Sequence, residues 1–416
     1  MTPRPRPPLR PLEDALQLLL AQAAPLPQRE WVATGEADAR VLAQDVVSAL
    51  QVPPQDNSAM DGYALRCAEV QAPGQTFSVS QRIAAGSPAA ALQPGTLARI
   101  FTGAPIPAGA DAVLMQEDCE LLAQTDAGGQ PQVRLLAMPQ PGQWIRRSGE
   151  DVARGDLALA AGTRLGPAEL GLAASIGLDR LQVARRPRVA LFSTGDELVM
   201  PGTVAPQDMP PGAIYNSNRF FLSALLRRLG CEVSDLGIVP DQREATVQAL
   251  HAAAQAHDVI LTSGGVSVGE EDHIKPAVQA LGTLDLWQIA IKPGKPFAHG
   301  RIGAAHVLGL PGNPVASLVT CLVLVRPFLL RLQGVQEVGL PTVAARADFD
   351  WPQADKRREF LRVRRNPQGG LDLFANQSSG VLTSAVWGDG LVDNPPNQSI
   401  RHGDTVRYVA FSELLA

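Results

Sequence analysis

Cysteine is scarce in this sequence, and no cysteine lies close to another. The four are Cys67, Cys119, Cys231 and Cys321, and they form no CxxC pair. Zinc sites and disulfide frameworks are recognised by close, regular cysteine spacing, so neither organises this chain. The six histidines form no ligand pair, which argues against a zinc or iron site. We expect the cysteines to be small buried apolar residues.

The sequence also lacks a long hydrophobic run. Its most apolar segment, residues 315–325, is far shorter than the roughly 20 residues that cross a bilayer. An apolar stretch near residue 16 follows three arginines, as in a signal peptide, but acidic residues interrupt it. Its apolar positions share one face of an amphipathic helix: Leu12, Ala15, Leu16 and Leu19. We therefore predict a helix behind a proline-rich tail, in a cytoplasmic protein that spans no membrane.

Positive charge is not in excess, and lysine is rare. The net charge is −5, which gives the surface as a whole no electrostatic reason to bind nucleic acid. Lysine and arginine together number 36, yet the only lysines are Lys275, Lys292, Lys295 and Lys356. Two of these four lie in the short segment Lys292-Pro-Gly-Lys295. Because lysine is a compact point charge, this pair is a candidate for binding an anion.

The 416 residues suggest two to four domains, at a prior of about 150 residues each. Residues 183–333 alternate strands with helices, which predicts a doubly wound, mostly parallel α/β sheet. Short strands with glycine and proline turns predict an inserted β-rich domain at 51–140. Residues 8–50 and 141–182 flank it as one elongated, discontinuous helical or mixed domain. An all-β pattern over 334–416 predicts a small barrel.

Polar, glycine-rich segments follow the predicted strands of the α/β domain. They are 193–197, Asp241, 263–272, 292–295 and 311–314. Ligands of open parallel sheets bind beyond the carboxyl ends of the strands, so we predict a site there. The glycine loop at 263–269 suits an anion, because its backbone N–H groups converge near a helix start.

Other motifs were weighed against this interpretation. Walker A and GxGxxG spacings are absent, which excludes a P-loop and a nicotinamide-binding motif. Residues 265–269 match GxSxG around Ser267, but a hydrolase nucleophile stands at the immediate end of its strand. Asp241 and Asp272 are candidates for a hard cation shared with phosphate oxygens. For Asp272, helix capping is the competing interpretation.

Eight segments together resemble the MoeA family of molybdopterin molybdenumtransferases, which is related to the gephyrin E domain. The matching segments are 57–64, 102–105, 149–151, 193–198, 216–218, 263–272, 292–296 and 310–315. The resemblance covers nearly the whole chain. It implies the four domains given above, with molybdate inserted into adenylated molybdopterin and AMP released.

The resemblance also implies roles for individual residues. The catalytic candidates are Asp61, Thr102, Asp151, Glu197, Asp241 and Asp272, and the last three are the Mg²⁺ ligand candidates. The substrate-binding candidates are Ser193, Thr194, Gly195, Asn218, Ser263, Gly264, Gly265, Ser267, Lys292, Lys295, Pro311 and Pro314. A homodimer is implied, in which the Asp61 loop of one subunit faces the α/β site of the other. Transient contacts with molybdopterin adenylyltransferase and with molybdoenzymes are further expectations.

Two departures from the family pattern concern the site. Many relatives have serine directly after the Pro-Gly-Asn-Pro-Val sequence, whereas this chain has Ala316 and then Ser317. Arg357, Arg362 and Ser379 match only loosely the segments that approach molybdate in the family.

Two alternative functions stay open, a molybdopterin adenylyltransferase activity and a non-catalytic cofactor-binding scaffold. The sequence does not distinguish molybdate from tungstate as the preferred oxyanion.

Overall fold

The computed structural model describes residues 9–239, 242–265 and 274–415. The chain divides into two compact units. Unit 1 comprises Met1–Gln44, Ala161–Gly166 and Leu181–Ala416, and unit 2 comprises Asp45–Ala160 and Pro167–Arg180.

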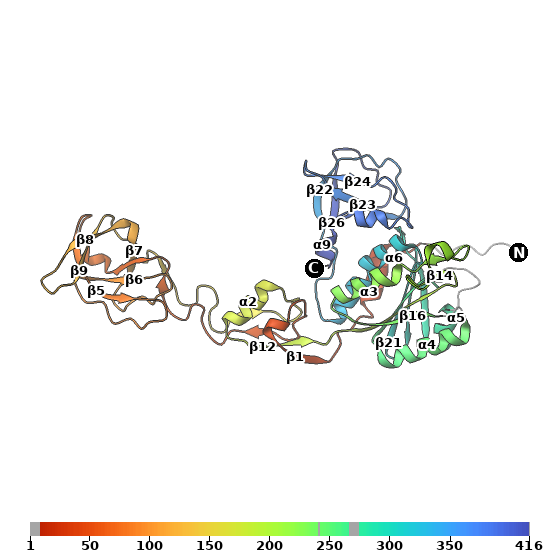
Figure 1. The fold of residues 1–416 in the computed structure, drawn as a ribbon, viewed down its shortest axis with the longest axis horizontal. Coiled ribbons are helices and arrows are strands. Elements are labelled where there is room, and N and C mark those ends of the chain that lie inside the picture. The colour runs from red at the N-terminus through yellow and green to blue at the C-terminus, as the bar shows by residue number, and fades with distance from the viewer. Residues whose placement is uncertain (1–8, 240–241, 266–273, 416) are drawn as a thin grey trace. The chain divides into compact units, whose positions relative to one another are not determined.

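The centre of unit 1 is a six-stranded sheet (Figure 1). In sheet order its strands are β16 (Glu232–Val239), β13 (Arg188–Thr194), β17 (Val259–Ser263), β21 (Ala305–Leu310), β20 (Pro296–Ile302) and β18 (Thr283–Gln288). The first four run parallel, β20 runs antiparallel to them, and the edge strand β18 pairs antiparallel with β20 and so runs in the same direction as the first four. Along β13, Val189 and Leu191 pack into one core, and Ala190 and Phe192 pack into another. Both faces of the sheet are therefore buried, as in a doubly wound fold.

Helices supply the rest of these two cores. On one face lie α3 (Asn218–Arg228) and a long helix at 314–332, and on the other lie α4 (Arg243–Ala256) and α5 (Ile274–Leu281) (Figure 1). The predicted alternation of strands and helices is confirmed. The long helix consists of α6 (Pro314–Thr320), a π-helical turn (Cys321–Val325) and α7 (Arg326–Leu332). It is apolar and long enough to cross a membrane, but 89% of it is buried inside the protein, as in a core helix.

The N-terminal helix α1 (Leu12–Leu20) packs into the core that contains α3 and the long helix. Its buried residues are Leu12, Ala15 and Leu19, and Leu16 is partly buried against the same cluster. The predicted amphipathic helix is thus confirmed. Among the cysteines, Cys231 and Cys321 are buried in this core, whereas Cys67 and Cys119 are only half-buried.

The C-terminal part of unit 1 is a closed five-stranded barrel. Its strands are β22 (Val343–Ala347), β23 (Arg358–Arg365), β24 (Gly370–Leu373), β25 (Gly390–Asn394) and β26 (Thr405–Ala410). Pairing of β23 with β25 closes the sheet, and the interior contains Leu361, Val363 and Val392. The predicted small barrel is confirmed.

One short strand of the α/β region is paired with the barrel. β19 (Ile291–Lys292) runs parallel to β23, with Ile291 opposite Arg358 and Lys292 opposite Glu359. The lysine segment follows the edge strand β18 of the α/β sheet as predicted, but its first residue, Lys292, belongs to the separate strand β19 that pairs with the barrel. The apolar run at 283–291 divides into the edge strand β18 and the separate strand β19, because the chain turns between them toward the barrel.

Unit 2 contains a second six-stranded sheet. In sheet order its strands are β7 (Ala112–Met115), β4 (Gly62–Leu65), β6 (Thr96–Ile100), β5 (Thr76–Ile83), β9 (Pro131–Leu135) and β8 (Cys119–Thr125). The turn at 127–130 joins the antiparallel strands β8 and β9. The sheet packs two cores, one around Leu97 and Leu114 and the other around Ile100 and Val113.

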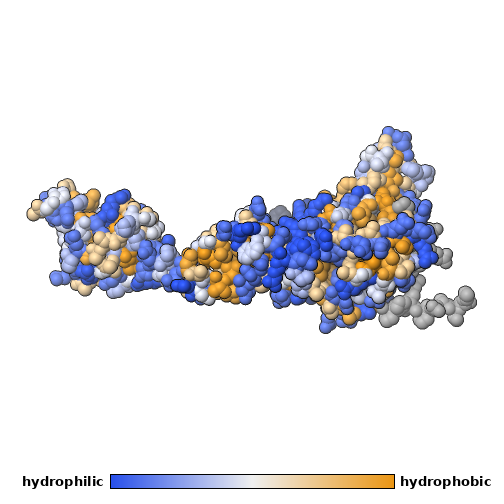
Figure 2. Space-filling view, turned by 90° about the horizontal axis from the view of Figure 1, so that it is seen from below, coloured by the Kyte–Doolittle hydropathy of each residue, from blue (hydrophilic) through white to orange (hydrophobic). Residues whose placement is uncertain are grey.

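Two short ladders connect this sheet to the rest of unit 2. β3 (Asn57–Ser58) pairs with β10 (Ile145–Arg146), and β2 (Val46–Val47) pairs with β11 (Leu157–Leu159). Val47 and Leu157 face each other across the second ladder and are 57% and 56% exposed. Figure 2 shows one face of the molecule, on which apolar patches interrupt the hydrophilic surface.

Candidate functional site

A cavity of about 690 Å³ opens at the carboxyl ends of β13, β17 and β21. Nine of the predicted site residues line it: Thr194, Glu197, Asn218, Ser263, Gly264, Lys292, Lys295, Pro311 and Pro314. They come from segments that are up to 120 residues apart in the chain, since Thr194 and Pro314 both belong to the lining. Parallel strands bring these segments together because their carboxyl ends meet at one edge of the sheet.

The other predicted residues lie elsewhere. Asp241, Ser267 and Asp272 fall outside the described residues. Ser193 is 1% exposed within β13, and Gly195 and Gly265 flank the cavity in sequence without being part of its lining. Asp61, Thr102 and Asp151 belong to unit 2.

The first loop of the cavity depends on a glycine. Gly195 has a φ of +139°, and a Cβ atom at this position would lie 2.4 Å from Oε2 of Glu197. The Glu197 carboxylate thus folds back over the Gly195 backbone, which only glycine permits. Glu197 is exposed and faces the cavity, where its oxygens are suited to a hard cation or a polar substrate group.

Asn218 joins three of the loops that surround the cavity. It begins α3, and its Nδ2 donates hydrogen bonds to Ser263 Oγ at 2.8 Å and to the Gly312 carbonyl at 2.6 Å. Asn218 is 9% exposed, so these bonds are shielded from water and fix the positions of the loops.

The structure shows the positions of Ala316 and Ser317, where this chain departs from the family pattern. Ala316 is part of the cavity lining, whereas Ser317 is fully buried and its Oγ has no hydrogen-bond partner in the described structure. A serine at position 316 would place a hydroxyl at the cavity, and this chain has a methyl group there instead. Ser317 therefore does not replace the missing serine.

Three cationic side chains reach the cavity: Lys292, Lys295 and Arg357. The Lys292 ammonium lies 3.0 Å from Glu359 Oε1 and 3.4 Å from Asp355 Oδ2. Arg357 forms a bidentate ion pair with Asp355, at 3.0 and 2.8 Å. Within the described part of the chain, Lys295 forms no ion pair. Its charge is therefore the one least compensated by a carboxylate.

The barrel supplies part of the cavity wall. Gln377, Ser378 and Ser379 line the cavity, and the Ser379 carbonyl accepts a hydrogen bond from the Val315 backbone N–H at 2.9 Å. This segment is held by Arg362, which is 1% exposed and donates to Ser384 Oγ and to the Ser378 carbonyl. Because Arg362 has no carboxylate among these partners, burial lowers its pKa to about 10.

Sequence reasoning missed Asp355 and Glu359, the carboxylates that hold the cavity cations. No sequence spacing relates them to Lys292, since the pairing of β19 with β23 places them together. Glu359 is fully buried, and its second oxygen accepts a hydrogen bond from Trp351 Nε1 at 2.8 Å. A charged residue inside a predicted barrel strand, in Arg-Arg-Glu-Phe-Leu, was the only available signal.

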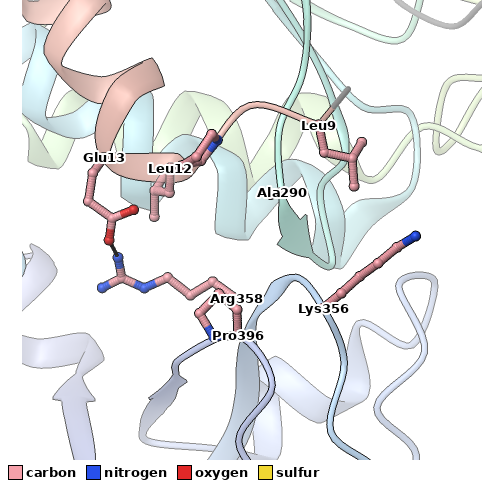
Figure 3. A pocket seen from close by; sticks show the side chains of 8 residues that line it. Leu9, Leu12, Glu13, Ala290, Lys356, Arg358 and Pro396 are labelled. Carbon is pink, nitrogen blue, oxygen red and sulfur yellow. Dashed lines mark hydrogen bonds and ion pairs between the residues drawn. The ribbon is translucent and has the colours of Figure 1, made fainter. Parts of the chain in front are cut away.

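A smaller pocket of about 340 Å³ lies where α1, the segment before β19 and the barrel meet (Figure 3). In Figure 3, Glu13 and Arg358 point toward each other and form an ion pair, whereas Lys356 extends away from them. Arg358 also pairs with the buried Asp393. These contacts compensate the charge of Arg358, and none of the predicted site residues lines this pocket.

In unit 2, Asp61 and Thr102 form a direct pair. Asp61 Oδ1 accepts hydrogen bonds from the backbone N–H and from the hydroxyl of Thr102, both at 2.8 Å. These two bonds, with a smaller contribution from Arg99, lower the pKa of Asp61. Asp61 is therefore an anion at neutral pH, with Oδ2 left to accept from other groups. The exposed Asp151 side chain is not part of this pair.

The described residues contain no group of three or more His, Cys, Asp or Glu side chains that would hold a metal ion. Of the three predicted Mg²⁺ ligands, the described part of the chain includes only Glu197. Its carboxylate at the cavity is the donor type that Mg²⁺ prefers.

The fold and the cavity define a multidomain protein whose α/β domain has a cavity lined by cationic side chains at the carboxyl edge of its sheet. Three family models match: MoeA N-terminal region (domain I and II) over residues 10–177, a probable molybdopterin binding domain over 190–331, and MoeA C-terminal region (domain IV) over 344–411. The chain belongs to the MoeA family.

Similar proteins support this assignment over the full length. The molybdopterin molybdenumtransferase of Haemophilus influenzae is 39% identical, over 97% of this chain and 99% of its own. That of a Nostoc species is 37% identical, over 79% and 74%. The crystal structure of the molybdopterin biosynthesis moeA protein from Pyrococcus horikoshii OT3 matches with a TM-score of 0.83 and 28% identity, over 97% of this chain and 100% of that one.

Proposed function

We propose that this protein is a molybdopterin molybdenumtransferase, which inserts molybdate into adenylated molybdopterin and releases AMP. The observation that carries this proposal is the cavity at the α/β edge, where Lys292, Lys295 and Arg357 surround space for an oxyanion beside Glu197. The relatives named molybdopterin molybdenumtransferase, which match the chain along most of its length, support the same reaction.

The test is turnover of adenylated molybdopterin, followed by AMP release with and without molybdate. Molybdate-dependent AMP release is the expected result. Formation of adenylated molybdopterin from molybdopterin and ATP would instead indicate an adenylyltransferase. Binding without any AMP release would indicate a scaffold. Repeating the assay with tungstate determines the preferred oxyanion.

The lysines offer a sharper test of the oxyanion site. We expect Lys295→Ala to raise the molybdate concentration needed for half-maximal turnover, because the uncompensated ammonium of Lys295 is suited to a tetrahedral oxyanion. Lys292→Ala should do the same and also destabilise the protein, since it leaves the buried Glu359 without its cation. An unchanged molybdate dependence in both variants would make these lysines structural charges.

For the metal, we propose that Glu197, Asp241 and Asp272 hold Mg²⁺, which when bound would neutralise phosphate charge. Asp272→Asn tests this role, because asparagine caps a helix nearly as well as aspartate but lacks its charge. We expect near-normal thermal stability and a fall in AMP release by orders of magnitude. Wild-type AMP release by Asp272→Asn at saturating Mg²⁺ would leave only the capping role.

We further propose a homodimer whose sites combine the Asp61 loop of one subunit with the α/β cavity of the other. Exposed apolar side chains such as Val47 and Leu157 support a protein interface. Thr102 and Asp151 would act with Asp61 in this arrangement. The cytoplasmic location and the transient contacts with molybdopterin adenylyltransferase and molybdoenzymes stay predictions.

A further inference from the structure

Two arginines lie directly opposite each other on neighbouring strands of unit 2. Arg82 on β5 is the register partner of Arg99 on β6, and Tyr63 on β4 is the partner of Arg99 on the other side. Like charges directly opposite in a sheet repel and destabilise it. Neither arginine forms an ion pair within the described part of unit 2, although Arg99 lies close enough to Asp61 to help lower the pKa of that carboxyl group.

Both guanidinium groups lie against the same phenyl ring, that of Phe101. The Cζ atoms of Arg82 and Arg99 lie 4.5 and 4.7 Å from the centre of the Phe101 ring, and Arg99 also lies 5.1 Å from the Tyr63 ring. Arg99 is fixed further by hydrogen bonds to the Gly62 carbonyl and to Gln116 Oε1. Arg82 is exposed and makes no hydrogen bond to the described residues. The guanidinium N–H groups of Arg82 therefore face solvent, and the neighbouring guanidinium of Arg99 is held in place.

The arginine pair adjoins the Asp61–Thr102 pair. Phe101 directly precedes Thr102, and Gly62 after Asp61 is the register partner of Ile100. Asp61 lies near Arg99, and Glu117 accepts a hydrogen bond from the Gln116 side chain that Arg99 also contacts. Planar guanidinium groups match the oxygens of a phosphate group and bind them in pairs.

We propose that Arg82 and Arg99, which lie against Phe101, form a binding site for a phosphate group, and that its ligand is the phosphate of AMP. The choice of AMP rests on the proposed function, in which AMP is the leaving group. The phosphate chemistry rests on the geometry of unit 2 alone. The site would hold the adenylyl phosphate near Asp61 during the reaction and retain AMP afterwards.

The test uses isothermal titration of AMP into the full-length protein and into Arg82→Gln. Arg82 is the better target, since Arg99→Gln would also remove the bonds to Gly62 and Gln116. We expect AMP to bind about 10- to 100-fold more weakly to Arg82→Gln, as loss of charge-assisted hydrogen bonds predicts. Arg82→Glu should weaken it further, and adenosine should bind both proteins equally.

The matched control is Arg134→Gln, on β9 of the same sheet, where an exposed arginine pairs with Glu120 at 2.7 Å. It should bind AMP as the wild type does, and all variants should melt at the wild-type temperature. Equal AMP affinity in Arg82→Gln and wild type would overturn the proposal, as would a wild type that binds no AMP. If wild type releases no AMP from adenylated molybdopterin, the proposed function fails, whereas AMP binding that depends on Arg82 would still support the phosphate site.

Discussion

At the scale of single residues, Lys292 is held by acids that the cavity itself does not contain. Its ammonium contacts Glu359 and Asp355, and it lies 5.7 Å from the centre of the Trp351 ring. The side chain of Glu359 is 1% exposed, whereas that of Lys292 is 38% exposed. The buried Glu359 carboxylate thus fixes the position of the Lys292 ammonium, which stays partly exposed to solvent.

Replacing Glu359 with glutamine should both destabilise the protein and weaken its use of molybdate. Lys292 and Trp351 each donate a hydrogen bond to a different oxygen of Glu359. Glutamine has only one side-chain oxygen, so one of these two donors loses its acceptor. Because Lys292 is partly exposed, we expect a loss of about 2 kcal/mol, below the ~3–5 kcal/mol of a fully buried pair. Urea unfolding measures the first effect, and the molybdate dependence of AMP release measures the second.

Glu120→Gln is the control for this change, because its ion pair with Arg134 is exposed on both sides. Exposed pairs contribute less than about 1 kcal/mol, so its unfolding curve should stay close to wild type. If Glu359→Gln is as stable as Glu120→Gln and uses molybdate normally, Glu359 does not position Lys292.

At the scale of elements, the β20–β21 hairpin buries two histidines side by side. His299 Nε2 and His306 Nδ1 are 3.4 Å apart, and each side chain is 5% exposed. Burial, then Arg301 and then His299, lower the pKa of His306 to about 4, while Asp258 opposes the shift. Burial likewise lowers the pKa of His299, against the opposing effect of Asp285. The hairpin therefore folds around neutral imidazoles.

This pair predicts an acid-sensitive fold. The unfolded chain takes up a proton at His306 near pH 6.5, whereas the folded chain does so only near pH 4, so stability rises with pH between these values. His306 should therefore contribute about 3 kcal/mol at neutral pH that is lost on acidification to pH 4. Urea unfolding at several pH values should give a flatter profile for His306→Gln. Exposed His251→Gln should keep the wild-type slope, and an identical slope in both variants would contradict this.

Some elements could be predicted from the sequence, and others could not. The strands at 188–194 and 259–263 were readable because their apolar runs end in glycine and polar residues, and parallel pairing then brings their loops together. The pairing of β19 with β23 was not readable, because it joins segments 67 residues apart in the chain. The carboxylates that contact Lys292, Asp355 and Glu359, could therefore not be assigned to it from the sequence.

At the scale of the whole molecule, the β-rich part of unit 2 is inserted through one narrow ladder. Ser58 and Ile145 are register partners, and the Ala59 N–H donates to the Trp144 carbonyl at 2.8 Å. Entry and exit are thus adjacent, as in domains that were inserted into a host without breaking its core. The sheet between them has its own two apolar cores.

We therefore expect residues 59–144 to be removable. Replacing them with an Asn-Gly turn would close β3 and β10 into a hairpin. The shortened chain should unfold cooperatively in urea with the circular dichroism of an α/β and barrel protein, and it should release no AMP, because Asp61 and Thr102 are gone. Aggregation or non-cooperative unfolding of the shortened chain would show that the insertion is needed for folding.

The proposed homodimer predicts complementation between two inactive variants. Subunits carrying Asp61→Ala and subunits carrying Asp272→Ala should each be inactive alone. Mixed dimers would contain one site with both residues intact, so part of the AMP release should return after subunit exchange. If the mixture stays as inactive as its parents, the two residues act within one subunit.

The pairing of β19 with β23 also couples anion binding in the cavity to local opening of the barrel strand β23. Ile291 and Lys292 belong by sequence to the α/β domain, but their backbone is hydrogen-bonded to the barrel. An anion that binds Lys292 only while β19 is paired with β23 stabilises that pairing. Conversely, when β23 opens locally, the Lys292 ammonium is no longer held in the cavity. Backbone amides of β23 should consequently exchange with deuterium more slowly when molybdate fills the cavity, and amides of β9 in unit 2 should exchange at an unchanged rate.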